Sequence, residues 1–222
     1  MTPTVLAILR PQDGDVETLA DRLRGLVNDD RVAVETSRAD VHLPGVVAPP
    51  GLGVGALTWE CVSSRGRGIL GHPVVVLEVL RDVEIHTALT LLPLASAHVE
   101  TPAPLIKRTL FLRVRPDAST AAREQFQADL AAMPDHISTI RSWRLSRALG
   151  TGPHRERWTH IWEQEFASLD GLTGEYMTNP FHWTTVDAWF DAEVPHHIVE
   201  PELAHLFAAR GVPWSREELA SS

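Results

Sequence analysis

The sequence lacks several features that would place it quickly in a class of proteins. Only one of its 222 residues is a cysteine, Cys61, which excludes an internal disulfide and a cysteine-rich metal site. No apolar run approaches the roughly 20 residues of a membrane-spanning helix. The N-terminus has neither the basic segment nor the long apolar segment of a signal peptide. We therefore expect a cytoplasmic protein.

Cations are also scarce. Twenty Lys and Arg stand against 29 Asp and Glu, which gives a formal net charge of −9. Nucleic acids and anionic membranes are bound mainly through Lys and Arg, so neither is an expected partner. The sequence contains no G-x-G-x-x-G, P-loop or HExxH motif, the signals of nucleotide and zinc sites. A cluster of possible metal ligands lies near the C-terminus: His196-His197, Glu200 and His205. Adjacent residues of a strand, such as His196 and His197, point to opposite faces and are poor joint ligands, so we expect no metal.

The two halves of the chain echo each other. The apolar runs Val5–Leu9 and Leu110–Val114 are each followed by Arg-Pro, and they lie roughly 105 residues apart. Thr58-Trp59-Glu60 and Ile161-Trp162-Glu163 repeat at nearly the same offset. Near-constant spacing of matching landmarks indicates a tandem duplication.

Each half has the pattern of a β-α-β-β-α-β unit. The first helix has an apolar face formed by Val16, Leu19, Ala20, Leu23, Leu26 and Val27. The second half has a helix that starts at a Ser119 or Thr120 cap and is expected to stop at Pro134. The fold class expected is therefore α+β, with two tandem ferredoxin-like domains forming an intramolecular α+β barrel. We place the domains at residues 1–100 and 105–207, with a tail at 208–222.

Two strands of the second half show clear alternation. Ile140–Arg147 places Trp143 and Leu145 on one face and Arg144 and Ser146 on the other. In the next strand, Trp158, His160, Trp162 and Gln164 are expected to share a face. Outside these elements, Pro44–Gly55 predicts a long loop or lid, Thr101–Pro104 an interdomain linker, and Gly66–Asp82 either a helix or a strand.

The aromatic residues are concentrated in the second half. It holds six of the seven Trp, all six Phe and the single tyrosine, Tyr176. Tyr176 stands six residues before His182, with Asn179-Pro180 between them, so a phenol and an imidazole can converge across a helix break. This distribution favours a ligand pocket in the second half, although the aromatics could equally build only its core.

The same segment carries a family resemblance. A strand with His160 in its first half is followed by F-x-S-x-x-x-L from Phe166 and by Tyr-x-x-x-Pro-x-His from Tyr176 to His182. Over roughly Lys107 to Pro201, this order resembles the stress-responsive A/B barrel (Dabb) family of the dimeric α+β barrel superfamily. Barrels in this superfamily are dimeric, so the resemblance keeps a homodimer as an alternative for this chain.

The resemblance implies a reaction. In the similar plant polyketide cyclases this Tyr and His are the working pair, and a strand His occurs in the same context as His160. The resemblance therefore makes Tyr176, His182 and His160 the catalytic candidates here. The sequence departs from the cyclase pattern at Asn179, where the cyclases have a His, and at Phe181, where they have a small residue. The expected function is a cofactor-independent lyase or cyclase acting by His/Tyr acid–base catalysis on a small apolar carbonyl or aromatic compound.

Further residues are candidates for substrate binding: Trp143, Trp158, Trp162, Phe181 and Arg108. Arg108 stands where the cyclases have a His and could hold a carboxylate or phenolate, or be a solvated charge at a strand end. His182 and His160 could likewise be packing residues. Two alternatives stay open: a haem-dependent or cofactor-free oxygenase or decarboxylase, and a non-catalytic, stress-related ligand-binding protein.

Overall fold

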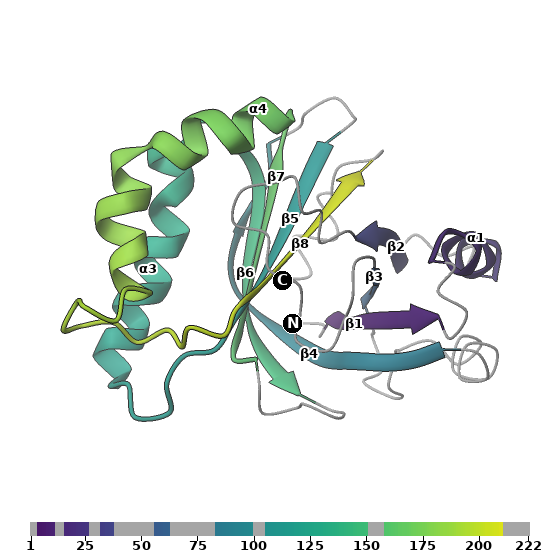
Figure 1. Cartoon of the computed structure of the whole chain (residues 1–222), viewed down its shortest axis with the longest axis horizontal. Coiled ribbons are helices and arrows are strands. Elements are labelled where there is room, and N and C mark those ends of the chain that lie inside the picture. Colours follow the sequence, from purple (N-terminus) through teal and green to yellow (C-terminus); the bar gives the residue numbers. More distant parts are fainter. Residues whose placement is uncertain are drawn as a thin grey trace.

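The computed structural model describes residues 4–11, 16–26, 32–37, 56–62, 83–99, 105–150 and 158–210. Its fold is α+β, with one curled antiparallel sheet and helices packed outside it, as expected at this coarse level (Figure 1). In chain order the elements are β1 (Thr4–Pro11), α1 (Val16–Leu26), β2 (Val32–Ser37), β3 (Ala56–Val62), β4 (Val83–Ala97), β5 (Leu105–Leu112), α3 (Thr120–His136), β6 (Ile140–Gly150), β7 (His160–Phe166), α4 (Leu169–Gly171), the π-helical η1 (Leu172–Tyr176) and η2 (His182–Val186), the 3₁₀-helical η3 (Asp187–Trp189) and β8 (Ala204–Arg210).

The eight strands form one sheet in the order β2-β3-β1-β4-β6-β7-β5-β8. The first four and the last four strands follow the same permutation, and β4 pairs with β6 where the halves meet. The two edge strands, β2 and β8, also lie close to each other. The sheet therefore curls until its ends approach.

Helix α3 begins where the sequence predicts and ends later than expected. The Ser119 hydroxyl accepts a hydrogen bond from the Ala122 N–H at 3.1 Å, which caps the first turn. The prediction that Pro134 stops the helix is wrong, because α3 continues to His136. Pro134 lies in the last turn, so its missing N–H removes one bond near the end of the helix and leaves the preceding turns intact.

The alternation in β6 is confirmed, but the expected face of Trp158 is wrong. Trp143 and Leu145 belong to the core beneath the helices, whereas Arg144 bonds Glu163 on the opposite face. Trp158 packs against Phe111 on that opposite face, away from Trp162. Because β7 begins only at His160, the two-residue alternation does not extend back to Trp158.

The sheet of the second half separates two apolar clusters. On the helix side, α3 and the η helices cover a large core that includes Phe126, Leu130 and Trp162. On the other side, residues from β1, β4, β5, β7 and β8 pack together. That side also holds the buried ion pairs Lys107–Glu163 (3.1 Å) and Arg144–Glu163 (2.5 Å). The larger, helix-covered core is the one that positions the site described below.

Several predicted segments lie outside the described residues: Pro44–Gly55, Gly66–Asp82, Thr101–Pro104 and the tail after Arg210. Strand β8 itself runs past Phe207 to Arg210.

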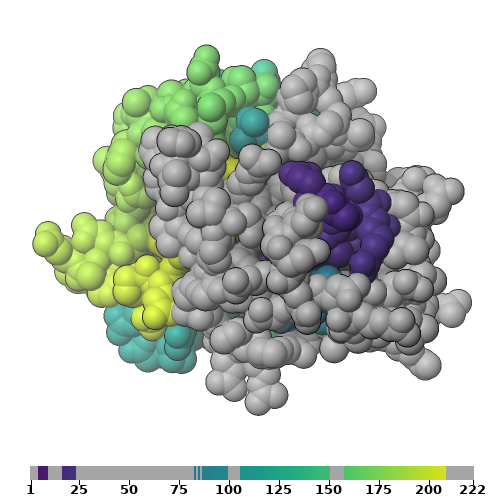
Figure 2. All heavy atoms as spheres, turned by 45° about the vertical axis from the view of Figure 1, so that its right-hand side comes forward, coloured from purple at the N-terminus to yellow at the C-terminus, as the bar shows by residue number. Residues whose placement is uncertain are grey.

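Within the described ranges, none of the helices is long and apolar enough to cross a membrane. In the space-filling view, the segment from about residue 160 to 200 and the α1 region occupy well-separated parts of the surface (Figure 2).

Candidate functional site

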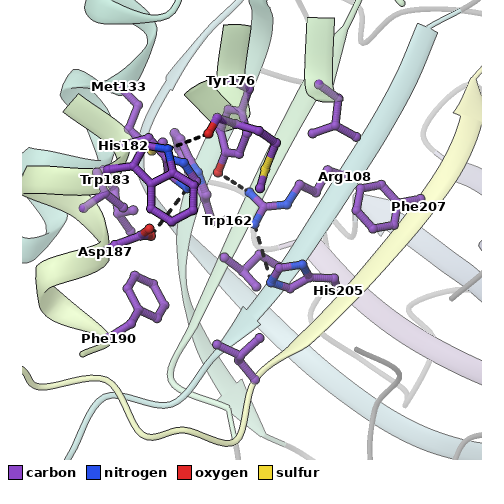
Figure 3. Close-up of a pocket in the computed structure, with 16 residues that line it drawn as sticks. Arg108, Met133, Trp162, Tyr176, His182, Trp183, Asp187, Phe190, His205 and Phe207 are labelled. Atoms are coloured by element: carbon purple, nitrogen blue, oxygen red, sulfur yellow. Dashed lines mark hydrogen bonds and ion pairs between the residues drawn. The ribbon is translucent and has the colours of Figure 1, made fainter. Parts of the chain in front are cut away.

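A cavity of about 310 Å³ lies between the helices and the outer face of β5, β7 and β8 (Figure 3). Its wall is mainly apolar, and its few polar side chains are Arg108, Tyr176, His182, Asp187 and His205. The apolar lining consists of Leu110, Leu130, Met133, Trp162, Leu172, Met177, Trp183, Val186, Phe190, Leu203 and Phe207. An apolar pocket with a few converging polar groups is the usual form of a small-molecule site.

The break at Asn179-Pro180 places the two flanking helical segments over the cavity. The Asn179 side chain donates to the His136 carbonyl at the end of α3 and accepts from the Phe181 N–H. Tyr176 ends η1 and His182 begins η2, and both segments are π-helical. The ring centroids of Tyr176 and His182 are 4.5 Å apart, so these two side chains converge as the sequence predicts.

Tyr176 is buried and anchored by Arg108. The Arg108 Nη1 donates to the Tyr176 hydroxyl at 2.6 Å and to the Gln164 Oε1 at 2.6 Å. The guanidinium carbon also lies 5.1 Å from the centre of the Tyr176 ring. Burial raises the pKa of Tyr176, against the opposing pull of Arg108. The phenol is therefore protonated at neutral pH and polarised by a cation.

His182 is a buried, neutral imidazole. Burial and the Arg108 charge lower the pKa of His182 to about 4. Its Nε2 lies 3.5 Å from Asp187 Oδ1, and its Nδ1 has no hydrogen-bond partner in the described part of the chain. Burial raises the pKa of Asp187 to about 6, partly offset by Arg108. At neutral pH the pair is thus a neutral imidazole beside a carboxylate that is mostly ionised.

His205, on β8, completes the polar end of the cavity. Its Nε2 lies 3.5 Å from Arg108 Nη2. Burial, then Arg108 and His182, lower the pKa of His205 to about 2. Arginine can only donate, so a neutral His205 with an unprotonated Nε2 is the acceptor in this contact.

His160 lies elsewhere, at the junction of β7 and α3. Its Nε2 faces the Gln127 amide nitrogen at 2.9 Å, and its Nδ1 faces the Thr159 hydroxyl at 2.9 Å. Burial lowers the pKa of His160 to about 4. It does not line the cavity. The structure therefore gives it the contacts of a packing histidine that links a strand to a helix.

The predicted substrate-binding residues divide into two groups. Arg108 and Trp162 line the cavity. Trp143 packs behind Trp162 with ring centroids 5.3 Å apart, Phe181 stacks on His136, and Trp158 belongs to the opposite face of the sheet. Across the described residues, no three His, Cys, Asp or Glu side chains gather into a group that could hold a metal ion.

Sequence reasoning missed the site roles of Asp187 and His205. Asp187 stands five residues after His182, and one wide helical turn brings it back to the imidazole. That spacing was a readable signal. His205 reaches Arg108 only because β8 pairs with β5, and this contact across 97 residues of sequence left no local pattern.

Comparison with protein families finds one match, described as the Stress responsive A/B Barrel Domain, over residues 106–199. Comparison with curated protein sequences gives no significant match.

Solved structures share the fold at low identity. A candidate monooxygenase from Fusobacterium nucleatum matches at 7% identity and a TM-score of 0.58, over 94% of this chain and 92% of that one. An anthrone oxidase-like protein matches at 11% identity and a TM-score of 0.56, over 94% and 91%. A chlorite dismutase from Candidatus Nitrospira defluvii matches at 10% identity and a TM-score of 0.50, over 99% of this chain and 94% of that one.

The domain match spans β5, α3, β6, β7 and the helices over the cavity, and so contains every polar residue of the site except His205. It confirms the resemblance that the sequence showed from Lys107 onward. Residues 106–199 of this chain match the model of the stress responsive A/B barrel domain.

Proposed function

We propose that this protein is a cofactor-independent lyase or cyclase that binds a small, mostly apolar carbonyl or aromatic compound and moves a proton on it. One observation carries the proposal: a neutral His182 and a Tyr176 polarised by Arg108 meet in an apolar cavity. The family and its structural neighbours support catalysis on or binding of small molecules in general.

The chemistry follows from the protonation states. Asp187 can accept the Nε2–H of His182, which leaves the Nδ1 lone pair to take a proton from a carbon next to a carbonyl. The negative charge then moves to the carbonyl oxygen. Tyr176 donates a hydrogen bond to that oxygen, and Arg108 stabilises the phenol oxygen as charge develops. The apolar wall limits the access of water, which strengthens both interactions.

Proton abstraction can be tested before the natural substrate is known. Aryl methyl ketones and 3-oxoacyl thioesters are incubated with the protein in D₂O, and exchange of the α-hydrogens is followed by NMR. We expect the wild type to accelerate exchange of at least one of these compounds. His182→Ala should lower the rate by about 10²–10⁴. Tyr176→Phe should cost less, about tenfold to a hundredfold, because it removes one hydrogen bond and keeps the ring.

The matched control is His98→Ala. His98 contacts Ser142 and does not line the cavity, so the exchange rate should stay at the wild-type value. Circular dichroism checks that each variant is folded. A folded His182→Ala protein that exchanges as fast as the wild type would overturn the proposal.

An oxygenase is the second candidate, favoured by the neighbours described as a monooxygenase and as anthrone oxidase-like. The same base could form a substrate carbanion that reacts directly with O₂. Oxygen uptake together with loss of turnover under argon would support this reading, whereas equal turnover with and without O₂ would support the lyase. A Soret band in the purified protein would instead indicate the haem-dependent form of this alternative.

We also infer that the two halves are tandem ferredoxin-like domains, at residues 1–100 and 105–207, that close one intramolecular barrel. The shared strand permutation and the proximity of β2 to β8 support this. The repeated landmarks fall on equivalent strands, Val5–Leu9 in β1 and Trp59 in β3 of one half, Leu110 in β5 and Trp162 in β7 of the other. Size-exclusion chromatography with light scattering tests whether the chain also forms a homodimer.

A further inference from the structure

Arg108 is a buried cation without a counter-ion among the described residues. The side chain is 6% exposed, and its partners are the neutral acceptors Gln164 Oε1, Tyr176 Oη and His205 Nε2. Buried charges in proteins are normally paired, because an isolated ion loses its hydration without compensation. Something other than these three groups should therefore balance this charge.

None of the acids in the described part of the chain forms an ion pair with Arg108. Asp187 lines the same cavity but forms no ion pair with Arg108, and it lies nearer to His182. Glu163 lies on the other face of the sheet, where Lys107 and Arg144 neutralise it. The charge of Arg108 thus faces the cavity without a carboxylate beside it.

The guanidinium also has unused donors. It carries five N–H groups, of which both on Nη1 and one on Nη2 are engaged. The Nε–H and the second Nη2–H are left, on neighbouring nitrogens of one planar group. Two such donors match the two oxygens of a carboxylate.

The rest of the cavity is apolar and aromatic. Trp162 and Phe207 lie on the sheet side, and Met133, Phe190 and Trp183 on the helix side (Figure 3). Trp183 is 53% exposed, and its indole N–H donates to the Met177 carbonyl, which fixes the ring at the border between cavity and solvent. This lining suits a ligand with an acidic end at Arg108 and a flat apolar body that extends towards Trp183.

We propose that the ligand is an organic monoanion, an aromatic or polycyclic carboxylic acid whose carboxylate is the missing counter-ion of Arg108. This inference rests on the cavity of the proposed function and specifies its substrate class. It assigns Arg108 a specificity role that is separate from proton transfer by His182.

A pair of probes with nearly the same shape tests the charge preference. Binding of 2-naphthoate and 2-naphthamide to the wild-type protein is measured by calorimetry at pH 7.5, together with quenching of tryptophan fluorescence. We expect the acid to bind about 10–100-fold more tightly than the amide, the range of a charge-assisted hydrogen-bonded pair. Equal affinities, or no binding of the acid, would overturn the proposal whatever the variants do.

Variants then assign the preference to Arg108. Arg108→Gln should abolish the difference between acid and amide, whereas Arg108→Lys should keep part of it, because the charge stays and the planar pair of donors is lost. Arg141→Gln, which removes an exposed cation of β6 outside the cavity, should leave the difference unchanged. A folded Arg108→Gln protein with the full preference would place the anion elsewhere.

The outcomes separate this inference from the proposed function. If the amide binds as well as the acid while His182→Ala still abolishes exchange, the anion preference fails and the proton-transfer function stands. If the acid is preferred but His182→Ala exchanges normally, the binding preference stands and the catalytic proposal fails.

Discussion

At the scale of single residues, burial sets the protonation of the ionisable groups in the cavity, and one cation, Arg108, acts on all of them. Arg108 lowers the pKa of His182 and of His205, opposes the rise in the pKa of Tyr176, and limits the rise in the pKa of Asp187. Burial is the larger cause in each case. The result is two histidines that remain neutral at pH values at which an exposed histidine would be charged.

The pH dependence of the reaction should show this directly. His182 must be unprotonated to act as the base, so the rate should be lost completely only as the pH falls through about 4. Protonation of Asp187 near pH 6 should remove the acceptor of the Nε2–H and cause an earlier, partial decline. Asp187→Asn should abolish the step near pH 6 and keep the lower one. A single limb at pH 6.5 in the exchange assay would contradict these assignments.

The pairing of Tyr176 with His182 could be predicted because both residues lie in one short segment with a readable helix break. Arg108 could be proposed but not placed, since its importance depends on burial and on partners from β7, η1 and β8. The predicted face of Trp158 was wrong, and His160 could not be placed relative to the cavity, for a related reason. Strand alternation indicates a face, but it does not say where the strand begins or what covers the face.

At the scale of elements, the short helices over the cavity depend on close packing at one glycine. A Cβ added at Gly171 would lie 3.1 Å from the Thr139 Cβ, whereas one at Gly174 would meet nothing within 4 Å. Both glycines lie in the α4–η1 helical segment, so alanine brings a similar gain in helix propensity at each. Packing should decide the difference between them.

We therefore expect Gly171→Ala to be less stable than Gly174→Ala by about 1 kcal/mol or more, the usual cost of mild overpacking. Urea denaturation followed by circular dichroism measures the free energy of unfolding of both variants. Gly174→Ala should match or exceed the wild type. The reverse order would show that Thr139 moves aside without cost.

At the scale of the whole molecule, three histidines with lowered pKa values make stability depend on pH. The pKa values of His160 and His182 are about 4 and that of His205 about 2, all below the unfolded value of 6.5. Between these values the unfolded chain binds more protons, so stability falls as the pH drops below 6.5. Asp187, with a pKa raised from 3.8 to about 6, acts in the opposite direction over a narrower range.

The net effect should be a melting temperature that is nearly constant above pH 7 and falls steadily from pH 6.5 to 4.5. Differential scanning fluorimetry at fixed ionic strength measures it. His160→Gln should flatten the slope by removing one of the three histidines without touching the cavity. A melting temperature that rises on acidification would mean that the histidines are not neutral in the folded state.

The fold was predictable at the level of element order, because amphipathic periodicity and the Ser119 cap are local signals. A barrel was expected from the repeat and the family resemblance, but the strand pairings that curl the sheet, such as β4 with β6, could not be predicted because no local pattern specifies them. Pro134 shows that a local signal can also mislead. Proline usually ends a helix, but α3 tolerates it in its last turn.

The π-helical turns that hold Tyr176 and His182 have a consequence for chain length. A π turn contains about one residue more than an α turn, and each residue rotates a helix by roughly 100°. Deleting a single residue from η1 or η2 would let the turn relax to an α-helix and would turn the side chains beyond it away from the cavity. Homologues that share the Tyr-x-x-x-Pro-x-His motif but are one residue shorter in η1 or η2 should have lost the site, even though they keep the tyrosine and the histidine.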